Sequence, residues 1–351
     1  MLALLTGLWA GLARLGWDVP LPRPGFSSLH GPLMVSGFLG TLISLERAVA
    51  LGRPWAYATP LLTGLGGVSL IVGAPLLAAQ WLMLAGSLGL VAIFAAIIRR
   101  HPALYTFTMG GGSLVWALGN LLWCLGWPVF LVVFWWAAFL VVTIAGERLE
   151  LARLQQVTGA AQATFLLLLG ILLTGLLLLG WSFDGGVRLF GLGLAGLALW
   201  LGRHDIARRT VKQAGLTRFI AICLLTGYVW LGISGLSAMW FGGVPVGPQY
   251  DATLHAFFLG FVFAMIFAHA PIIFPAVLGA RMTYRPLFYA HVVLLQVTLV
   301  VRLIGDAAGW SAGRQVGGLL NAVTLLLFLV NTVSALQSPP ERAGTAQGRG
   351  A

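Results

Sequence analysis

Two histidines on one apolar stretch, residues 251–278, are the first candidates for chemistry in this chain. His255 lies near the start of the stretch and His269 follows fourteen residues later. In a helix, fourteen residues advance about 21 Å and turn through about 1400°, so both rings fall within about 40° of one face. Ionisable or metal-ligating side chains at membrane depth are costly and are commonly functional. The stretch therefore predicts a helix that presents one imidazole near each membrane surface.

His30 provides a partner for His255 on another helix. It opens the apolar stretch 28–51, and both histidines are expected near the outer membrane surface. Two neutral imidazoles at matched depth can supply both axial ligands of a six-coordinate haem. The alternative is that each ring is hydrogen-bonded to backbone or water. Small residues after the two histidines would let a flat macrocycle or a neighbouring helix approach closely; they are Gly31, Ser36, Gly37, Gly40 and Gly260.

A second pair, His269 and His291, is expected toward the cytoplasmic surface. The turn at residues 279–288 connects their two helices, so the rings could meet across it. Imidazole suits several metals, and such a pair could bind a second haem or a copper ion. The alternative is a pair without metal that makes hydrogen bonds between helices or assists a proton path.

Three charged residues at helix ends also have two interpretations. Glu46 and Glu147 could receive protons at a cytoplasmic entrance, or could pair with the adjacent Arg47 and Arg148 without further function. Arg302 could be an interface anchor whose charged head reaches water. It could instead bind the carboxylates of a haem on the outer side, because arginine suits bidentate carboxylate recognition.

The elements that must position these residues are membrane helices. The chain has 351 residues, of which 59% are hydrophobic and 8% charged, and its repeated apolar runs of about 20 residues are typical of transmembrane helices. We expect an all-α transmembrane bundle of about twelve helices over a single domain, 1–337, and a short disordered cytoplasmic tail, 338–351. The first span is short and the eighth weak, so ten or eleven remain possible. The expected spans are 2–16, 28–51, 57–77, 79–98, 104–125, 127–146, 160–181, 187–202, 217–240, 252–277, 286–305 and 315–336.

The charge distribution predicts the orientation. The net charge is +11, and basic residues gather in alternate connections, which indicates the cytoplasmic side. We therefore expect a multi-pass protein of a bacterial-type inner membrane with both termini in the cytoplasm. We attribute the excess of basic over acidic residues to positions at the membrane surface and not to the binding of nucleic acid. Cys124 and Cys223 lie inside apolar runs and have no metal-ligand spacing.

Two motifs resemble the haem–copper oxidase subunit I superfamily and, within it, most closely the NnrS family of haem- and copper-containing membrane proteins linked to nitric oxide. The first is L-H-G-P-L-M-V-S-G-F, with His30 at its head. The second is L-H-A-F-F-L-G-F-V-F-A-M-I-F, with His255 at its head, followed by P-A-V-L-G. The resemblance implies an oxidase-like twelve-helix fold with the key histidines on the second and tenth helices. It also implies one b-type haem held by His30 and His255, with Arg302 near the haem carboxylates.

The sequence departs from the oxidase pattern at the second metal centre. Thr253 stands where the oxidases have a second histidine, and the expected sixth and seventh helices contain no histidine for their copper site. Dioxygen reduction of the usual kind is therefore not expected.

The sequence thus predicts a membrane protein that binds haem b, with copper as a possible second metal, and acts in electron transfer or nitric-oxide handling. Its expected partners are the lipid bilayer, an electron donor protein and a small gaseous ligand. Whether it is an enzyme is left open. The alternatives are a metal-free proton-coupled permease or channel, and an assembly protein of the same fold without a cofactor.

Overall fold

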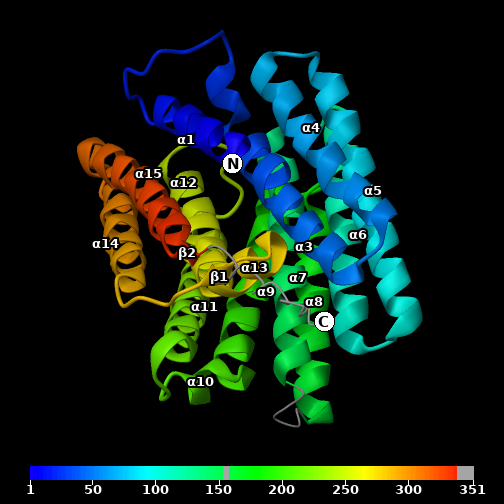
Figure 1. The fold of residues 1–351 in the computed structure, drawn as a ribbon. Helices are drawn as coiled ribbons and strands as arrows, with labels where there is room; N and C mark the ends of the chain where they lie inside the picture. Colours follow the sequence, from blue (N-terminus) through cyan, green and yellow to red (C-terminus); the bar gives the residue numbers. More distant parts are fainter. Residues whose placement is uncertain (153–157, 338–351) are drawn as a thin grey trace, which may run out of the picture.

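The computed structural model describes residues 1–152 and 158–337, which form a helical bundle (Figure 1). Ten of its helices are long and apolar enough to cross a membrane. The prediction of an all-helical, multi-pass membrane protein is confirmed at this level. The expected tail, 338–351, lies outside the described residues.

The first part of the chain, up to residue 152, forms the following elements: α1 (Leu2–Arg14), η1 (Phe26–Leu29), α2 (His30–Pro32), η2 (Leu33–Gly40), α3 (Thr41–Leu51), η3 (Pro54–Tyr57), α4 (Ala58–Val72), α5 (Leu76–Arg100), α6 (Leu104–Cys124) and α7 (Val129–Ala152). The second part forms α8 (Gly159–Leu178), α9 (Phe183–His204), α10 (Ala207–Thr210), α11 (Gly215–Phe241), α12 (Pro248–His255), η5 (Ala256–Phe263), α13 (Ala264–Leu278), β1 (Arg281–Met282), α14 (Phe288–Ala307), α15 (Ser311–Ser334) and β2 (Leu336–Gln337).

All twelve expected spans correspond to helices, but two of them are not among the ten candidate spans. Helix α1 has 13 residues, about 20 Å of helix, whereas a hydrocarbon core is about 30 Å thick. Helix α6 is also outside the ten. The expected eighth span, predicted to be weak, is α9, which has 22 residues and is one of the ten.

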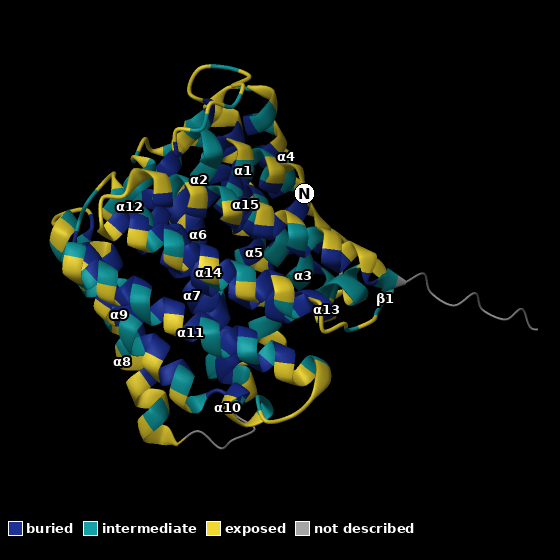
Figure 2. Cartoon of the chain, turned by 90° about the vertical axis from the view of Figure 1, so that its left-hand side faces the viewer, coloured by how far each residue is buried: buried dark blue, intermediate teal, exposed yellow. Residues whose placement is uncertain are grey.

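Two long spans occupy the interior of the bundle. In the most apolar 18-residue part of each helix, 83% of the residues are buried in α7 and 67% in the span 248–278. In α8 the corresponding share is only 22%. Figure 2 shows that buried residues are concentrated on the central helices and exposed residues on the outer helices. Helix α8 therefore lies at the periphery, where its apolar side chains suit contact with lipid.

The connections gather at two ends of the bundle (Figure 1). We call the end at the top of the view, where α1 lies, the His30 end, because His30 opens α2. It carries the α8–α9 and α11–α12 connections. The Glu46 end, at the bottom, carries the α5–α6 connection and α10. The basic segments 99–101 and 203–212 therefore share one end, as the charge pattern predicts.

A two-residue strand pair joins the connection after α13 to the end of α15. Strands β1 and β2 are antiparallel, with Arg281 opposite Gln337 and Met282 opposite Leu336. The sequence predicts only a turn between α13 and α14. The pairing ties two segments about 55 residues apart, which no local pattern signals.

The spans that carry His30 and His255 share a departure from α-helical geometry. Each histidine is followed by an eight-residue π-helical segment: η2 in the first span and η5 in the second. Such segments are rare and frequently occur at functional sites, where they re-aim side chains.

Candidate functional site

His30 and His255 lie on two sides of a cavity at the His30 end of the bundle. The cavity has a volume of about 210 Å³ and is bordered by α1, by the spans 26–51 and 248–278, and by α7, α14 and α15. The two ring centroids are 6.1 Å apart and the ring planes differ by 22°. The structure therefore brings together the pair of residues that the sequence predicts to be axial ligands.

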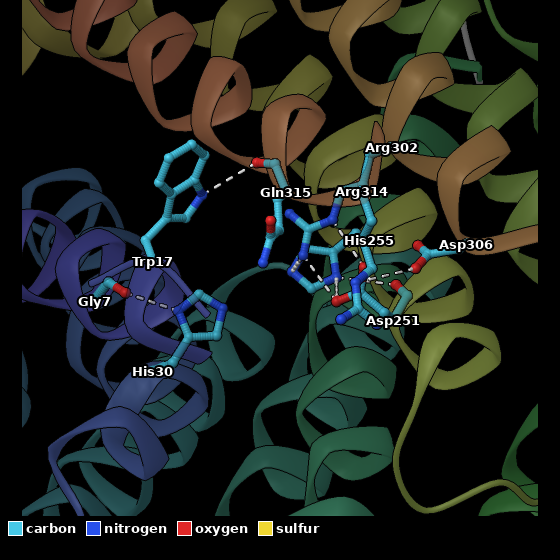
Figure 3. A network of polar contacts seen from close by, with 9 residues as sticks. All are labelled: Gly7, Trp17, His30, Asp251, His255, Arg302, Asp306, Arg314 and Gln315. Carbon is cyan, nitrogen blue, oxygen red and sulfur yellow. Dashed lines mark hydrogen bonds and ion pairs between the residues drawn. The ribbon is translucent and has the colours of Figure 1, made fainter. Parts of the chain in front are cut away.

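This separation fits a pair of axial ligands. Two nitrogens at about 2 Å on opposite sides of one iron lie about 4 Å apart, and each ring centroid lies about 1 Å further out, which gives a centroid separation of about 6 Å. In Figure 3 the second ring nitrogen of His30 lies on the side that faces His255.

A backbone carbonyl orients the His30 ring. His30 Nδ1 is 2.8 Å from the carbonyl oxygen of Gly7 in α1. A carbonyl can only accept a hydrogen bond, so Nδ1 carries the proton and Nε2 has a free lone pair. Gly11 lies against the same ring: a Cβ at that position would be 2.8 Å from Nδ1. Helix α1 therefore supports His30 through one carbonyl and one close approach.

Asp251 orients the His255 ring in the same way. His255 Nδ1 is 2.9 Å from the carbonyl oxygen of Asp251 and 3.2 Å from its Oδ1. Both atoms accept, so Nδ1 donates and Nε2 has the lone pair. Hydrogen-bonded carboxylates commonly fix ligating histidines in this manner.

Arg302 holds Asp251 and contacts His255. Its Nε and Nη2 each donate to a carboxylate oxygen of Asp251 at 2.8 Å, and Nη2 lies 3.3 Å from His255 Nε2. Arg302 is only 5% exposed, so it is not an interface anchor whose head reaches water. A metal bound at His255 Nε2 would replace the weaker contact and leave the bidentate pair with Asp251 intact.

Three arginines line the cavity. Arg14 and Arg314 line it together with Arg302. Arg314 Nε is 3.9 Å from the buried Asp306, whose two carboxylate oxygens have no hydrogen-bond partner. Figure 3 shows Arg302, Arg314 and both aspartates clustered beside His255. Three arginines beside two aspartates leave a formal excess of one positive charge in the cavity, which favours a ligand with a carboxylate.

The small residues that follow the two histidines mostly serve helix packing. Gly37 approaches Gly67 of α4, Gly40 lies against Trp116, and Gly260 lies against Trp230. Only Gly31 among the glycines after the histidines lines the cavity. Of the two roles predicted for these positions, close approach of a neighbouring helix applies to most.

The structure does not bring His269 and His291 together. His269 lines a second cavity, and its Nδ1 is 2.6 Å from the carbonyl oxygen of Met265. His291 is buried against the rings of Phe267 and Phe328, and its Nδ1 is 3.3 Å from Asn331 Nδ2. Phe267 and His269 lie two positions apart on one helix and so project to different sides. In the described part of the chain, no group of three or more His, Cys, Asp or Glu is arranged to hold a metal ion.

Glu46 and Glu147 meet at one arginine. Arg47 Nη2 lies 3.3 Å from Glu46 and forms an ion pair with Glu147. Arg148 instead pairs with the buried Asp205, at 3.6 Å. Glu46 therefore pairs with the adjacent Arg47, as one of the two interpretations predicts, whereas Glu147 pairs with Arg47 and Arg148 pairs with Asp205.

We call the cavity between His30 and His255 the upper cavity. Several residues that line it or support its histidines have no signal in the sequence. Gly7, Gly11 and Arg14 belong to an unremarkable first helix, and Arg314 lies at the start of the last one. Asp251 gives a weak signal, because it precedes His255 by one helical turn and acidic residues are rare in this chain. Such a pair at four-residue spacing shares a helix face.

The chain belongs to the family described as Domain of unknown function (DUF8744), whose family model matches residues 1–337. No curated protein and no solved structure matches the chain.

Proposed function

We propose that this protein is a membrane haem protein in which His30 and His255 bind a b-type haem in the upper cavity. The observation that carries the proposal is the pair of imidazoles at 6.1 Å between centroids, each oriented through Nδ1. The Nε2 lone pair of His30 is then available to a metal, and a metal at His255 Nε2 would replace the 3.3 Å contact with Arg302 Nη2. A hydrogen bond from a histidine Nδ1 to a backbone carbonyl does not by itself identify a metal ligand. His204 and His269 make such a bond to the carbonyl four residues earlier. The facing arrangement across a cavity is what sets His30 and His255 apart.

The rest of the cavity also suits this group. Its walls are mostly apolar, as cofactor sites commonly are, with residues such as Leu8, Leu12, Leu39, Val133 and Phe258. The formal excess of arginine over aspartate in the lining favours a group that carries carboxylates. Gly11 lets α1 pack directly against the His30 ring, because a Cβ there would lie 2.8 Å from Nδ1.

The donor set favours electron transfer. A haem held by both His30 and His255 would supply one-electron redox chemistry, and a gas could bind it only where one of the two imidazoles had left. The chain's own residues orient the two imidazoles, exclude water and keep a buried guanidinium near the metal position. Nitric-oxide handling would require one histidine to leave, which nitric oxide added to the reduced protein would reveal as a changed haem spectrum.

Haem content tests the proposal directly. We expect purified protein from haem-replete cells to show a Soret band and a low-spin reduced-minus-oxidised spectrum. His30→Ala and His255→Ala should each lose most of the haem. His204→Ala is the matched control, because His204 makes the same backbone contact but stacks on Trp200 away from the cavity. A protein without a Soret band, or full haem content in both ligand variants, would refute the assignment.

A further inference from the structure

A second cavity lies between α3, α7 and α13, toward the Glu46 end of the bundle. It has a volume of about 80 Å³. Leu39 lines both this lower cavity and the upper one. The two cavities are therefore separated by little more than the side chains between them.

The polar groups of the lower cavity are mainly hydrogen-bond acceptors. His269 Nδ1 is used by the carbonyl oxygen of Met265, so Nδ1 donates and Nε2 is the ring's acceptor. The carboxylates of Glu46 and Glu147 also line the cavity, and both share Arg47 as their cation. A ligand in this cavity must therefore bring hydrogen-bond donors.

The walls of the lower cavity favour an organic ligand over water or a metal ion. Apolar side chains make up most of the lining, and its polar members are limited to Glu46, Thr143, Glu147 and His269. Water fills cavities that are polar enough to give each molecule several partners. The acidic and histidine side chains in this described region do not form a metal-binding group. A largely apolar ligand with a few hydroxyl groups satisfies both parts of the surface.

The way into the lower cavity also suits a lipid-soluble ligand. Ile43 of α3 and Ile266 and Ile273 of α13 line the cavity and are only half-buried, so its wall reaches the molecular surface between these two helices. Both belong to candidate membrane spans. An apolar tail could therefore extend from the cavity into the hydrocarbon region without placing any unpaired polar group in lipid.

We propose that the lower cavity binds a lipid-soluble quinol, whose hydroxyl groups donate to His269 Nε2 and to the carboxylate of Glu46 or Glu147. Its ring packs on the apolar walls and its tail leaves between α3 and α13.

A quinol at this place would also supply electrons, a role that rests on the proposed function. Conversion of the quinol to the quinone releases two electrons and two protons. The protons pass to His269 Nε2 and a glutamate carboxylate, and from there to water at the Glu46 end. A haem held by His30 and His255, on the other side of Leu39, would take these electrons one at a time and would pass the first to a one-electron acceptor before it takes the second.

Binding is measured first and does not depend on haem. The full-length protein in nanodiscs is titrated calorimetrically with decylubiquinol and with its dimethyl ether, which keeps the ring and tail but has no donor. We expect the quinol to bind and the ether to bind at least about tenfold more weakly, the effect of losing hydrogen bonds to buried acceptors. Equal affinity for the two compounds, or no binding of the quinol, would overturn the proposal.

Two variants locate the site. His269→Phe keeps an aromatic ring but removes the acceptor, and should weaken quinol binding about tenfold. His204→Phe is its matched control and should bind as the unmodified protein does. Ala270→Leu places three more carbons at a buried position of the cavity wall and should abolish binding. Unchanged quinol affinity in both cavity variants would overturn the proposed location of the site. If Ala270→Leu does not fold, the affinity of His269→Phe alone decides the location.

Electron transfer is measured separately, by the rate at which decylubiquinol reduces the protein's haem. Reduction that is lost in Ala270→Leu, with haem content unchanged, supports the role as donor site. If the protein contains haem and quinol binds to it without reducing that haem, the role of the quinol as electron donor is overturned. Quinol binding by a protein that contains no haem would refute the proposed function while leaving the binding site in place.

Discussion

Asp251 is the residue on which the geometry of His255 depends. Its backbone and side chain both accept from His255 Nδ1, and its carboxylate receives the bidentate contact of Arg302. One carboxylate thus determines the tautomer of a candidate ligand and compensates a buried guanidinium. Removing its charge leaves Arg302 without a counter-ion in a place that water reaches poorly.

Asp251→Asn is therefore expected to weaken haem binding. Carboxylates that support a ligating histidine typically contribute about 10–100-fold to metal affinity, and we expect a loss in that range when apoprotein is titrated with haemin. Asp184→Asn is the control, since Asp184 forms an exposed ion pair with Arg188, a kind of pair that contributes little. Equal haem affinity in the two variants would contradict the supporting role of Asp251.

Between helices, close packing at glycines determines how α9 meets α11. A Cβ on Gly191 would lie 2.6 Å from the carbonyl oxygen of Gly235, and a Cβ on Gly235 would lie 2.7 Å from that of Gly191. Small residues that let helix backbones approach in this way are typical of membrane helix contacts. Side chains at either position would force the two helices apart.

We expect Gly191→Val to destabilise the α9–α11 contact by about 1–3 kcal/mol, the usual cost of overpacking. Gly202→Val serves as the control on the same helix, because a Cβ there has nothing within 4 Å. Thermal unfolding in detergent compares the two variants. A midpoint for Gly191→Val that equals that of Gly202→Val would contradict the close contact.

Helices α7, α10 and α11 are joined by a buried polar cluster around Asp205, at the Glu46 end. Tyr228 Oη donates to Asp205 Oδ2 at 2.7 Å, the amide of Ala207 donates to Oδ1 at 2.7 Å, and Arg148 lies 3.6 Å away. Asp205→Ala should cost about 3–5 kcal/mol, because it leaves a buried arginine unpaired. Tyr228→Phe should cost only about 1–2 kcal/mol, the effect of one hydrogen bond. Unfolding measurements that place the two variants in the reverse order would contradict the role of Arg148.

On the scale of the whole molecule, the arrangement of the connections predicts which surfaces face each compartment. Arg208 lies in the basic α9–α11 connection and Trp181 lies in the α8–α9 connection at the other end (Figure 1). In a background without Cys124 and Cys223, Trp181→Cys should react with an impermeant maleimide in intact cells. Arg208→Cys should react only after permeabilisation, because basic connections favour the cytoplasm. The opposite labelling pattern would reverse the orientation.

The sequence is a good guide to the helices because each depends on its own composition. The two interior spans are visible as apolar runs, and the ends of most helices lie within a few residues of those expected. The sequence does not predict the β1–β2 pair or the π-helical segments η2 and η5. Both depend on contacts between segments far apart in the chain or on small changes in backbone hydrogen bonding that composition does not encode.

The candidate site could be predicted only in part for the same reason. His30 and His255 stand out because an imidazole in an apolar stretch is unusual. The contributions of Gly7, Gly11 and Arg314 do not stand out, because a carbonyl, a missing side chain and a helix-end arginine are common features. Their roles arise from the packing of α1 and α15 against the two histidine-bearing spans.

By itself, then, the sequence determined a helical membrane protein with histidines at membrane depth on the spans 26–51 and 248–278, because hydropathy and helical periodicity are local properties. Only the tertiary structure decided which histidines meet. His30 faces His255 across a cavity, whereas His269 projects from one side of α13 and His291, on α14, packs against Phe267 on another side of α13. The distance between side chains on separate helices depends on how those helices pack, and no spacing within one helix specifies that packing.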